Sequence, residues 1–228
     1  ATAMQKLAHE IICVSEYQAS FLKREKGVIV APNSLSNNFT NRLIPTPQTA
    51  FERKQILMLG SLKLYKSPLE FIELAQKLPQ FTFELVVNDT QENINGFMKE
   101  HKINICKNLT IYPQQNDVVP FYNQASLVLN LSDKKQVVET FGLTALEAMS
   151  AGLPVIVPTE GGIAEMVVDG ENGYKIDVQN LNQIAECIKT ILSDETLYMK
   201  LAQNALAYSK RFSEAKMVNC IEMILNRK

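Results

Sequence analysis

Residues 138–157 read VETFGLTALEAMSAGLPVIV, and this stretch decides the fold. It follows the apolar run Ser126–Leu131, which has the composition of a buried strand. Gly142–Ala151 has the length and amphipathic spacing of a helix, and Gly152-Leu153-Pro154 ends that helix. The apolar run Pro154–Val157 then predicts a second strand. Strand, helix and strand in this order are typical of the βαβ unit of a parallel sheet.

The same alternation extends in both directions along the chain. Strands that are apolar throughout, rather than in alternate positions, are typical of a parallel sheet covered on both faces. We therefore predict an α/β fold, a Rossmann-like parallel sheet with helices on both faces. The further strands expected are Glu10–Val14, Val28–Ala31, Gln55–Leu59, Thr82–Val87 and Leu109–Tyr112, and the further crossover helices are Pro68–Leu78 and Asn93–His101.

The chain divides unevenly. The stretch from Asn33 to Arg53 is polar, contains Pro45 and Pro47, and shows no hydrophobic period, so it predicts a domain linker. Residues 1–44 hold about two strands and one helix, too little for a core of their own. We expect them to be the end of a larger domain plus the start of the linker, and residues 45–228 to be a complete sheet domain.

Composition excludes several classes of protein. The chain has 228 residues, 46% of them apolar and 21% charged, with a net charge of −1, which excludes a disordered chain and gives no electrostatic footprint for nucleic acid. No apolar run reaches the roughly 18 residues of a membrane span. The four cysteines are scattered and include no CxxC pair, which predicts buried reduced thiols and a cytoplasmic location. With only two histidines in addition, no metal site is expected.

The start of the helix at Gly142 carries the chemistry. Helix N-termini that follow parallel strands lie at the carboxyl edge of the sheet, where ligands bind in this architecture. The N–H groups from Phe141 to Thr144 have no intrahelical acceptor, and the helix dipole favours an anion there. Gly142 lacks the side chain that would keep a phosphate from the backbone.

Two carboxylates flank this anion site. Glu139 precedes the helix and Glu147 lies about one turn inside it, so both can face a ligand at the helix start. A carboxylate accepts two hydroxyl donors at once, which suits the vicinal diol of a sugar. The alternative is that Glu139 is a solvated loop residue and Glu147 a surface helix residue.

The run from Glu139 to Ile156 closely resembles the E-x7-E signature of family 4 retaining glycosyltransferases. Those enzymes have the GT-B architecture, in which two Rossmann-like domains face each other across a cleft. The resemblance covers nearly the whole chain. It continues in Leu59–Ser67, Tyr122–Ser126, Gly161–Glu165 and Asp169–Tyr174.

The resemblance implies a role for each matched position. Glu139 is expected near hydroxyls of the transferred sugar, the backbone of Phe141–Leu143 near the sugar and diphosphate, and Glu147 on the ribose hydroxyls. Lys66 is expected to neutralise the diphosphate. The expected catalytic residues are Glu139 and Lys66, and the expected donor-binding residues are Gly60, Ser61, Lys66, Glu139, Thr140, Phe141, Gly142, Leu143, Thr144 and Glu147.

The chain departs from the family pattern at two positions. Ser61 replaces the usual Arg, and Ser67 replaces the usual Gly. One phosphate-binding charge is therefore absent, so Lys66 and the helix N-terminus would stabilise more of the charge on the leaving diphosphate, with help from Lys63.

The loop before Glu139 is longer than the resemblance predicts. Its Lys134 and Lys135 are interpreted as solvated surface charges in preference to donor ligands. Gly161-Gly162 predicts a turn before a short helix, although its N–H groups could reach the donor. Asn88-Asp89 is interpreted as a turn or a helix cap, and the base pocket is expected near Tyr112-Pro113.

The leading hypothesis is the donor-binding part of a retaining glycosyltransferase that moves a hexosyl group from a nucleotide-diphosphate sugar, without a metal or other cofactor, in glycan or polysaccharide biosynthesis. A glycan or lipid-linked acceptor, and any membrane contact at the inner face, are expected to involve an N-terminal domain absent from this chain. The helix at 212–228 would cross back to that domain, and the chain alone is expected to be inactive. The alternative is a non-catalytic nucleotide-sugar-binding or partner module.

Overall fold

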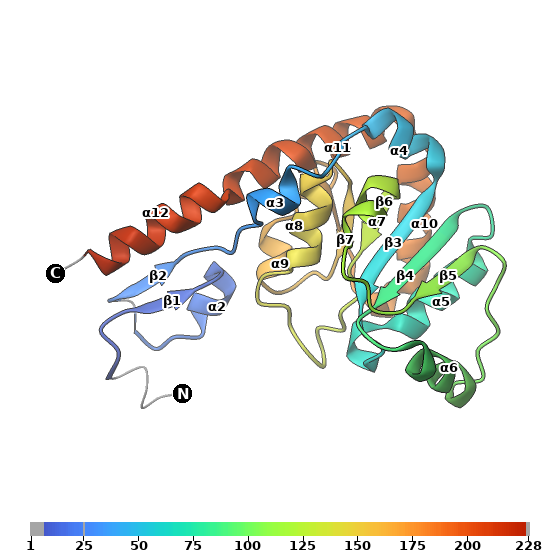
Figure 1. Cartoon of the computed structure of the whole chain (residues 1–228), viewed down its shortest axis with the longest axis horizontal. Helices are drawn as coiled ribbons and strands as arrows, with labels where there is room; N and C mark the ends of the chain where they lie inside the picture. Colours follow the sequence, from blue (N-terminus) through green and yellow to red (C-terminus); the bar gives the residue numbers. More distant parts are fainter. Residues whose placement is uncertain (1–6, 25, 227–228) are drawn as a thin grey trace.

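A computed structural model describes residues 7–24 and 26–226. Its main feature is a six-stranded parallel sheet in the order β5-β4-β3-β6-β7-β8. The predicted fold class, a parallel sheet between two layers of helices, is confirmed (Figure 1). The strands are β3 (Gln55–Gly60), β4 (Thr82–Val87), β5 (Leu109–Tyr112), β6 (Leu127–Leu129), β7 (Val155–Val157) and β8 (Gly173–Lys175).

The strand order places a switch point in the middle of the sheet. From β3 the chain first adds β4 and β5 on one side, and then returns to add β6, β7 and β8 on the other. This is the 3-2-1-4-5-6 order of the doubly wound fold, in which the loops diverge between the first and fourth strands. Here these strands are β3 and β6, paired in register at Ile56 with Leu127. Ligands in such folds bind at the carboxyl ends of those two strands.

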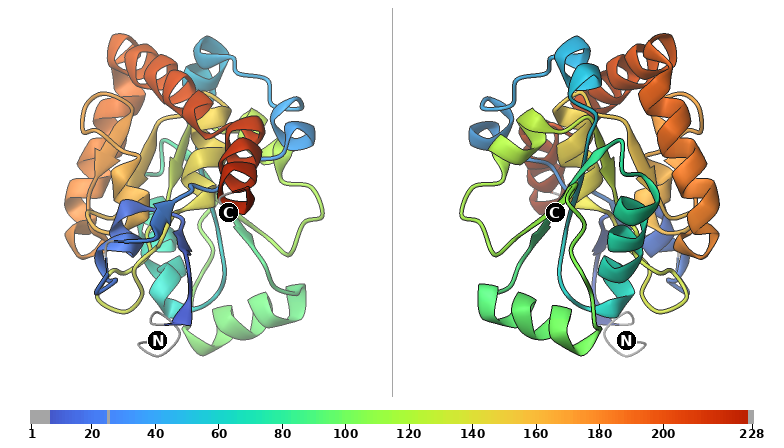
Figure 2. Two further views of the ribbon diagram at one scale, coloured as in Figure 1. Left: turned by 90° about the vertical axis from the view of Figure 1, so that its left-hand side faces the viewer. Right: turned by 90° about the vertical axis from the view of Figure 1, so that its right-hand side faces the viewer.

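Helices cover both faces of the sheet (Figure 2). The helices α5 (Pro68–Lys77) and α10 (Leu181–Ser193) pack together on one face, and α7 (Val119–Gln124) and α8 (Leu143–Ser150) lie on the other. α6 (Gln91–Glu100) connects β4 to β5, and α9 (Gly162–Glu165) lies between β7 and β8. Ile56, Leu127 and Val155 are fully buried between these layers, which explains why the central strands contain little but aliphatic side chains.

The N-terminal residues form a separate small unit. Strands β1 (Ile11–Cys13) and β2 (Val28–Val30) pair in parallel, with α2 (Glu16–Ser20) between them in the chain. The unit lies beside α9 (Figure 1), where the Glu165 carboxylate accepts the backbone N–H of Glu16 at 3.2 Å and that of Tyr17. Residues 1–6 of the predicted 1–44 segment lie outside the described residues, and the domain boundary at 44/45 stays a prediction.

The linker is more ordered than its composition indicates. Two short helices, α3 (Asn37–Thr40) and α4 (Pro47–Arg53), form within this stretch and were not predicted, and its role as a domain linker stays a prediction. Leu43 and Ala50 are buried, and α4 packs against α11 (Glu195–Ser209). Single apolar residues spaced by polar ones make these contacts, so no period is visible in the sequence.

Short breaks separate the three C-terminal helices. α10 ends at Ser193, and Asp194 caps α11 by accepting the N–H of Leu197 at 3.0 Å. A 3-10 turn, η3 (Lys210–Phe212), leads into α12 (Glu214–Leu225). α12 runs toward the N-terminal unit (Figure 1), and its Glu214 accepts the N–H of Asn37 at 2.9 Å. Residues 227–228 lie outside the described part, and packing of this helix on a larger N-terminal domain stays a prediction.

Besides α3 and α4, the strand β8 and the helix α7 were not predicted. β8 has three residues, begins with Gly173 and follows the Asp169–Asn172 turn, so its apolar signal is weak. α7 has six residues and carries Pro120 in its first turn. Short 3-10 turns, η1 (Leu64–Lys66) and η2 (Val178–Asn180), complete the described chain. The strands and crossover helices predicted between residues 10 and 157 agree with the structure to within two residues at each end.

The structure bears on two expectations from composition, the state of the cysteines and the absence of a membrane span. All four cysteines are free thiols, as predicted, but only Cys13 is buried, while Cys106, Cys187 and Cys220 are half-buried. Burial raises the pKa of the Cys187 thiol to about 12. Within residues 7–24 and 26–226, none of the helices has the length and apolar character needed to cross a bilayer.

Candidate functional site

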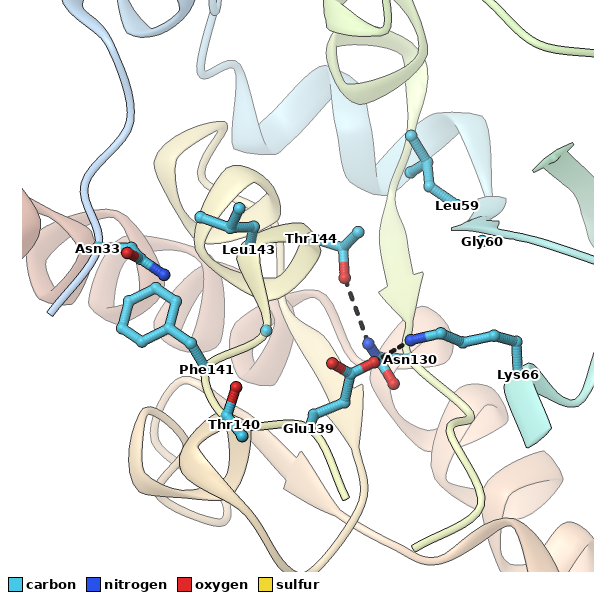
Figure 3. A pocket seen from close by; sticks show the side chains of 11 residues that line it. Asn33, Leu59, Gly60, Lys66, Asn130, Glu139, Thr140, Phe141, Leu143 and Thr144 are labelled. Carbon is cyan, nitrogen blue, oxygen red and sulfur yellow. Dashed lines mark hydrogen bonds and ion pairs between the residues drawn. The ribbon is translucent and has the colours of Figure 1, made fainter. Parts of the chain in front are cut away.

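A cavity of about 470 Å³ opens at the switch point of the sheet, between the ends of β3 and β6 and the start of α8 (Figure 3). This volume lies in the range of small-molecule and cofactor sites. Two segments distant in sequence, the end of β3 with η1 and the loop that leads into α8, supply most of the wall. The lining residues are Asn33, Leu59, Gly60, Lys66, Asn130, Glu139, Thr140, Phe141, Gly142, Leu143 and Thr144.

The first turn of α8 faces this cavity. Gly142 is the N-cap residue, with φ of +88°, a conformation that side chains other than glycine rarely adopt. The N–H groups of the following first turn have no intrahelical acceptor, so they present partial positive charge. The structure adds a second reason for glycine, because a Cβ at position 142 would lie 2.5 Å from the Ile163 side chain.

Gly161 and Gly162 pack against the backbone of the loop that carries Glu139. The Gly162 N–H donates to the Glu139 carbonyl at 2.9 Å, so this N–H is already used within the protein. A Cβ at Gly161 would lie 2.4 Å from the same carbonyl oxygen, and one at Gly162 would lie 1.9 Å from that of Thr140. The predicted turn before a short helix is confirmed as α9. These glycines let α9 pack directly on the backbone of the Glu139 loop.

Lys66 and Glu139 meet at the cavity wall (Figure 3). Lys66 ends η1, and its ammonium forms an ion pair with the Glu139 carboxylate, with 26% and 20% of the two side chains exposed. Ser132 joins them by donating to Glu139 Oε1 at 2.9 Å and accepting from Lys66 Nζ at 3.3 Å. Ser132 is 2% exposed and was not predicted as a site residue. An anion that entered the cavity would compete with Glu139 for the Lys66 ammonium.

Glu147 and Ser61 are placed differently from the other predicted residues. Neither lines the cavity, whereas Gly60, Lys66 and Glu139–Thr144 do. Glu147 turns toward α7, where the Tyr122 hydroxyl donates to its Oε2 at 2.5 Å. Burial raises the pKa of Glu147 above its usual value, and the Tyr122 hydrogen bond acts in the opposite direction. Glu147 is half-buried, so it is not the exposed helix residue of the alternative interpretation.

The long loop before Glu139 is tied down at several points. The Asp133 N–H donates to the Tyr65 carbonyl at 2.8 Å, and Lys134 pairs with Asp177 at 2.8 Å. Although burial alone would raise it, hydrogen bonds from Lys134 and Thr159 hold the pKa of Asp177 below its usual value. Lys134 is thus a partly buried structural cation and not the solvated charge we expected. Lys135 is exposed, as expected.

The remaining predicted positions lie around the same edge. Thr90 is the N-cap of α6, and its hydroxyl accepts the N–H of Asn93 at 3.2 Å. The predicted Asn88-Asp89 pair forms the bend just before this cap, where Asp89 accepts the Thr90 N–H at 2.8 Å. Lys63 is exposed, 5.8 Å from the Tyr65 ring centre, and does not line the cavity. Tyr112 hydrogen-bonds Glu84 at 3.2 Å. The base pocket near Tyr112-Pro113 stays a prediction.

Asn33 lines the cavity and was not predicted as a site residue. It lies just after β2, in a segment held by α12 through the Leu35–Ser213 bridge and the Ser34–Met217 contact at 3.2 Å. Figure 3 shows its amide beside Phe141. No signal in the sequence marks a single Asn in a polar linker, so only the three-dimensional structure places it here.

Metal-binding groups do not gather in this site. Across the part of the chain that the structure describes, no group of three or more His, Cys, Asp or Glu side chains is arranged to hold a metal ion. The charged groups lining the cavity are Lys66 and Glu139. Lys66 and the N-terminus of α8 are therefore the features placed to receive an anion.

The fold and the site together define a doubly wound α/β protein with a ligand cavity at its switch point. The particular family follows from sequence comparison, in which the profile described as "Glycosyl transferases group 1" matches residues 42–208. The chain belongs to this family.

Curated relatives agree with that assignment. The chain is 25% identical to an uncharacterized glycosyltransferase of Haemophilus influenzae over 82% of this chain and 53% of the relative. It is 30% identical to N-acetyl-alpha-D-glucosaminyl L-malate synthase of Bacillus anthracis over 61% of this chain and 36% of the relative. The matched part thus spans about half or less of these relatives.

Solved structures share the fold. HepE of Anabaena, in complex with UDP and glucose, is 22% identical with a TM-score of 0.83, over 100% of this chain and 65% of that protein. Sucrose-phosphate synthase of Thermosynechococcus elongatus is 20% identical with a TM-score of 0.79, over 98% and 60%. These similarities confirm the Rossmann-like half of a GT-B fold.

Proposed function

We propose that the chain is the donor-binding part of a retaining glycosyltransferase of family 4 that transfers a hexosyl group from a nucleotide-diphosphate sugar to a glycan or lipid-linked acceptor. The observation that carries the proposal is the cavity at the switch point, where a helix N-terminus, Lys66 and Glu139 converge. Family membership supports transferase activity. HepE, which has the same fold, was solved with UDP and glucose, which supports a nucleotide-sugar donor.

Each group has a role in the proposed chemistry. The first-turn N–H groups of α8 and the Lys66 ammonium bind the diphosphate, and they stabilise the charge that accumulates on it as the sugar departs. Gly60 and Thr140–Thr144 shape the site around the sugar and phosphates. Glu139, released from Lys66, accepts sugar hydroxyls, and Glu147 accepts those of the ribose. The reaction uses no metal, because cationic and N–H donors perform the neutralisation.

The acceptor and the cellular setting are also proposed. Acceptor binding and any membrane contact would involve residues of the natural protein outside this chain, so this chain alone would bind donor without completing transfer. The natural protein would act in glycan or polysaccharide biosynthesis in the cytoplasm. Substituting Glu139 or Lys66 by Ala in the natural protein should then remove most transfer activity, and unchanged turnover would contradict the placement of the site.

One observation favours a second candidate, a non-catalytic nucleotide-sugar-binding or partner module. Ser61 stands where the resembled family has Arg, and Lys63 does not line the cavity in its place. Lys66 is the cation that lines the cavity, and it is paired with Glu139. A binding module needs less charge stabilisation than an enzyme, since no charge develops on its ligand.

Calorimetric titration with UDP, GDP and ADP, each free and as its glucose conjugate, tests the proposal. We expect one base to be preferred and binding to weaken as salt rises, because phosphate contacts are electrostatic. Retention of binding without any turnover in the natural protein would favour the second candidate. Absence of binding to all six compounds by the folded chain would overturn the donor-binding proposal and leave the partner module as the remaining candidate.

A further inference from the structure

Tyr122 is buried next to Glu147, one of the predicted donor-binding residues, and does not line the cavity. It lies on α7, is 1% exposed, and donates its hydroxyl to Glu147 Oε2 on α8 at 2.5 Å. Phe39 of the linker packs edge-on against its ring, with the centroids 6.1 Å apart at 81°. Packing on all sides fixes the ring of Tyr122, and therefore the position of its hydroxyl. The hydrogen bond from this hydroxyl then holds the Glu147 side chain in one orientation.

Only half of the Glu147 carboxylate is engaged. Oε2 accepts from Tyr122, while Oε1 has no hydrogen-bond partner among residues 7–24 and 26–226. A carboxylate oxygen can accept two donors. Because desolvation of a charged acceptor is costly, a half-buried carboxylate with an open oxygen is suited to a hydroxyl ligand.

The helix that carries Tyr122 also holds residues 42–53 of the predicted linker in place. Asn123 Oδ1 accepts the Ile44 N–H at 2.9 Å, and Asn123 Nδ2 donates to the Arg42 carbonyl at 3.1 Å. Arg42 also forms an ion pair with Asp117, just before the helix. From the other end of the linker, Arg53 Nη1 donates to the Asn123 carbonyl at 2.8 Å. α7 is therefore fixed to the linker on one side and to Glu147 on the other.

We propose that Tyr122 is a positioning residue that orients Glu147 toward the ribose hydroxyls of the donor, and that Asn123 transmits the position of the linker to it. This inference rests on the proposed function only for the identity of the ligand. The contact between Tyr122 and Glu147 is testable without any nucleotide.

The pKa of Glu147 can be measured in the folded protein, and it changes only if the Tyr122 hydroxyl contacts the Glu147 carboxylate. Burial raises the pKa of Glu147, and the Tyr122 hydrogen bond offsets part of this rise. Tyr122 is the titratable group that bonds Glu147 among the described residues, and its own pKa is raised by burial and by Glu147. Removing the hydroxyl in Tyr122→Phe therefore raises the Glu147 pKa further.

The first experiment measures that pKa directly. The carbon resonance of the Glu147 carboxyl is followed from pH 4 to pH 8 in ¹³C-labelled wild type and in Tyr122→Phe, with Tyr198→Phe as the control. Tyr198 is an equally buried tyrosine whose hydroxyl bonds the Ser126 carbonyl at 2.8 Å. We expect a higher midpoint in Tyr122→Phe and no change in Tyr198→Phe. An unchanged midpoint in Tyr122→Phe would overturn the inference.

The second experiment separates this inference from the proposed function. Affinities for the preferred nucleoside diphosphate and its 2′,3′-dideoxy analogue are measured in wild type, Tyr122→Phe, Glu147→Gln and the double variant. We expect Tyr122→Phe to weaken binding of the ribonucleotide about tenfold and to leave the dideoxy analogue unchanged. The loss should vanish in the Glu147→Gln background, as a double-mutant cycle requires of one shared interaction.

The outcomes are distinct. Wild type that binds no nucleotide contradicts the proposed function and the ligand part of this inference. Wild type that binds, with Tyr122→Phe binding equally well, contradicts this inference alone. Asn123→Ala tests the linker: we expect a smaller loss of the same kind, about threefold, and unchanged affinity would overturn the role of the linker. Urea unfolding of each variant verifies that the compared proteins are folded.

Discussion

Lys66 and Glu139 lie 73 residues apart in the sequence and form an ion pair at the wall of the cavity. Both side chains are mostly buried, and Ser132 bonds to each of them. The Glu139 carboxylate thus compensates the charge of the cation that lines the cavity. In the proposed function, donor binding is an exchange in which the diphosphate replaces the Glu139 carboxylate on Lys66 and Glu139 becomes free for the sugar.

Lys66→Met should weaken UDP binding about 10- to 100-fold, because a hydrogen bond to a charged group contributes about 1.5–3 kcal/mol. Uridine, which has no phosphate, should bind the variant as it binds wild type. Calorimetry with both ligands makes the comparison. Lys77→Met, which removes an exposed lysine paired with Glu73 at 3.4 Å, is the control and should bind UDP normally. An equal loss for uridine would mean that Lys66 supports the fold and not the phosphate.

Ser61→Arg should restore a second phosphate cation and strengthen UDP binding about tenfold at low salt, since guanidinium groups bind phosphate oxygens in pairs. Ser61 directly follows β3, one residue beyond the lining residue Gly60. The gain should shrink in 0.5 M salt through screening. Ser61→Gln, which has similar length without charge, should show no gain. Equal affinities for Ser61→Arg and wild type would show that the diphosphate does not reach this end of β3.

Gly162→Ala should displace the loop that carries Glu139, because its Cβ would lie 1.9 Å from the Thr140 carbonyl oxygen. Overpacking of this kind costs about 1–3 kcal/mol of the free energy of unfolding. Gly96→Ala is the matched control: nothing lies within 4 Å of its Cβ, and it sits inside α6. That control should stabilise the protein by about 0.5–1 kcal/mol. Urea unfolding measures the free energy of unfolding of both variants. Equal changes in Gly162→Ala and Gly96→Ala would contradict the packing argument.

Ser67→Gly should stabilise the fold by up to about 1 kcal/mol. Ser67 has φ of +57° and is 1% exposed, in the left-handed region where a side chain is strained and glycine is not. Ser150→Gly, a change of the same type within α8, should instead destabilise by about 0.5 kcal/mol. Thermal unfolding measures both. A lower melting temperature for Ser67→Gly would show that the Ser67 side chain contributes packing that outweighs the backbone strain.

Glu84→Gln should stabilise the protein increasingly as pH rises. Burial raises the pKa of Glu84, an effect only partly offset by hydrogen bonds from Tyr112 and Gln55. The folded state therefore holds a proton that the unfolded state releases above about pH 4.5, so wild type loses stability through that range while the amide does not. Urea unfolding at pH 4.5 and 7.5 should show a larger advantage at pH 7.5. The exposed Glu186→Gln should show no such trend, and an advantage for Glu84→Gln that does not grow with pH would contradict the assignment.

The sheet could be predicted from the sequence because its signal is local. Runs such as Leu127–Leu129 and Val155–Val157 are apolar along their whole length, and the helix that begins beside Gly142 has its own start and stop residues. Lys66 and Glu139 were proposed together from family resemblance, and the structure brings them into contact. β8 was missed because three residues beginning with glycine carry almost no period.

The site details that escaped prediction are contacts between distant segments. Nothing near Glu147 indicates that Tyr122 will meet its carboxylate, and nothing near Lys134 indicates its pairing with Asp177. Gly162 was predicted only to form a turn. The structure shows a further requirement for glycine there, because the Thr140 backbone packs where a side chain would lie. Such contacts arise from the path of the loops at the carboxyl edge of the sheet, which hydrophobic periodicity does not specify.

Amide chemical-shift mapping tests the central claim, that the cavity at the start of α8 is the donor site. The ¹⁵N-labelled chain is titrated with the sugar conjugate of the nucleotide it prefers. We predict the largest shifts at the amides of Phe141, Gly142, Leu143 and Thr144, with smaller ones at Gly60 and Lys66. Saturable shifts confined to another surface, with the amides of the first turn of α8 unmoved, would contradict the account.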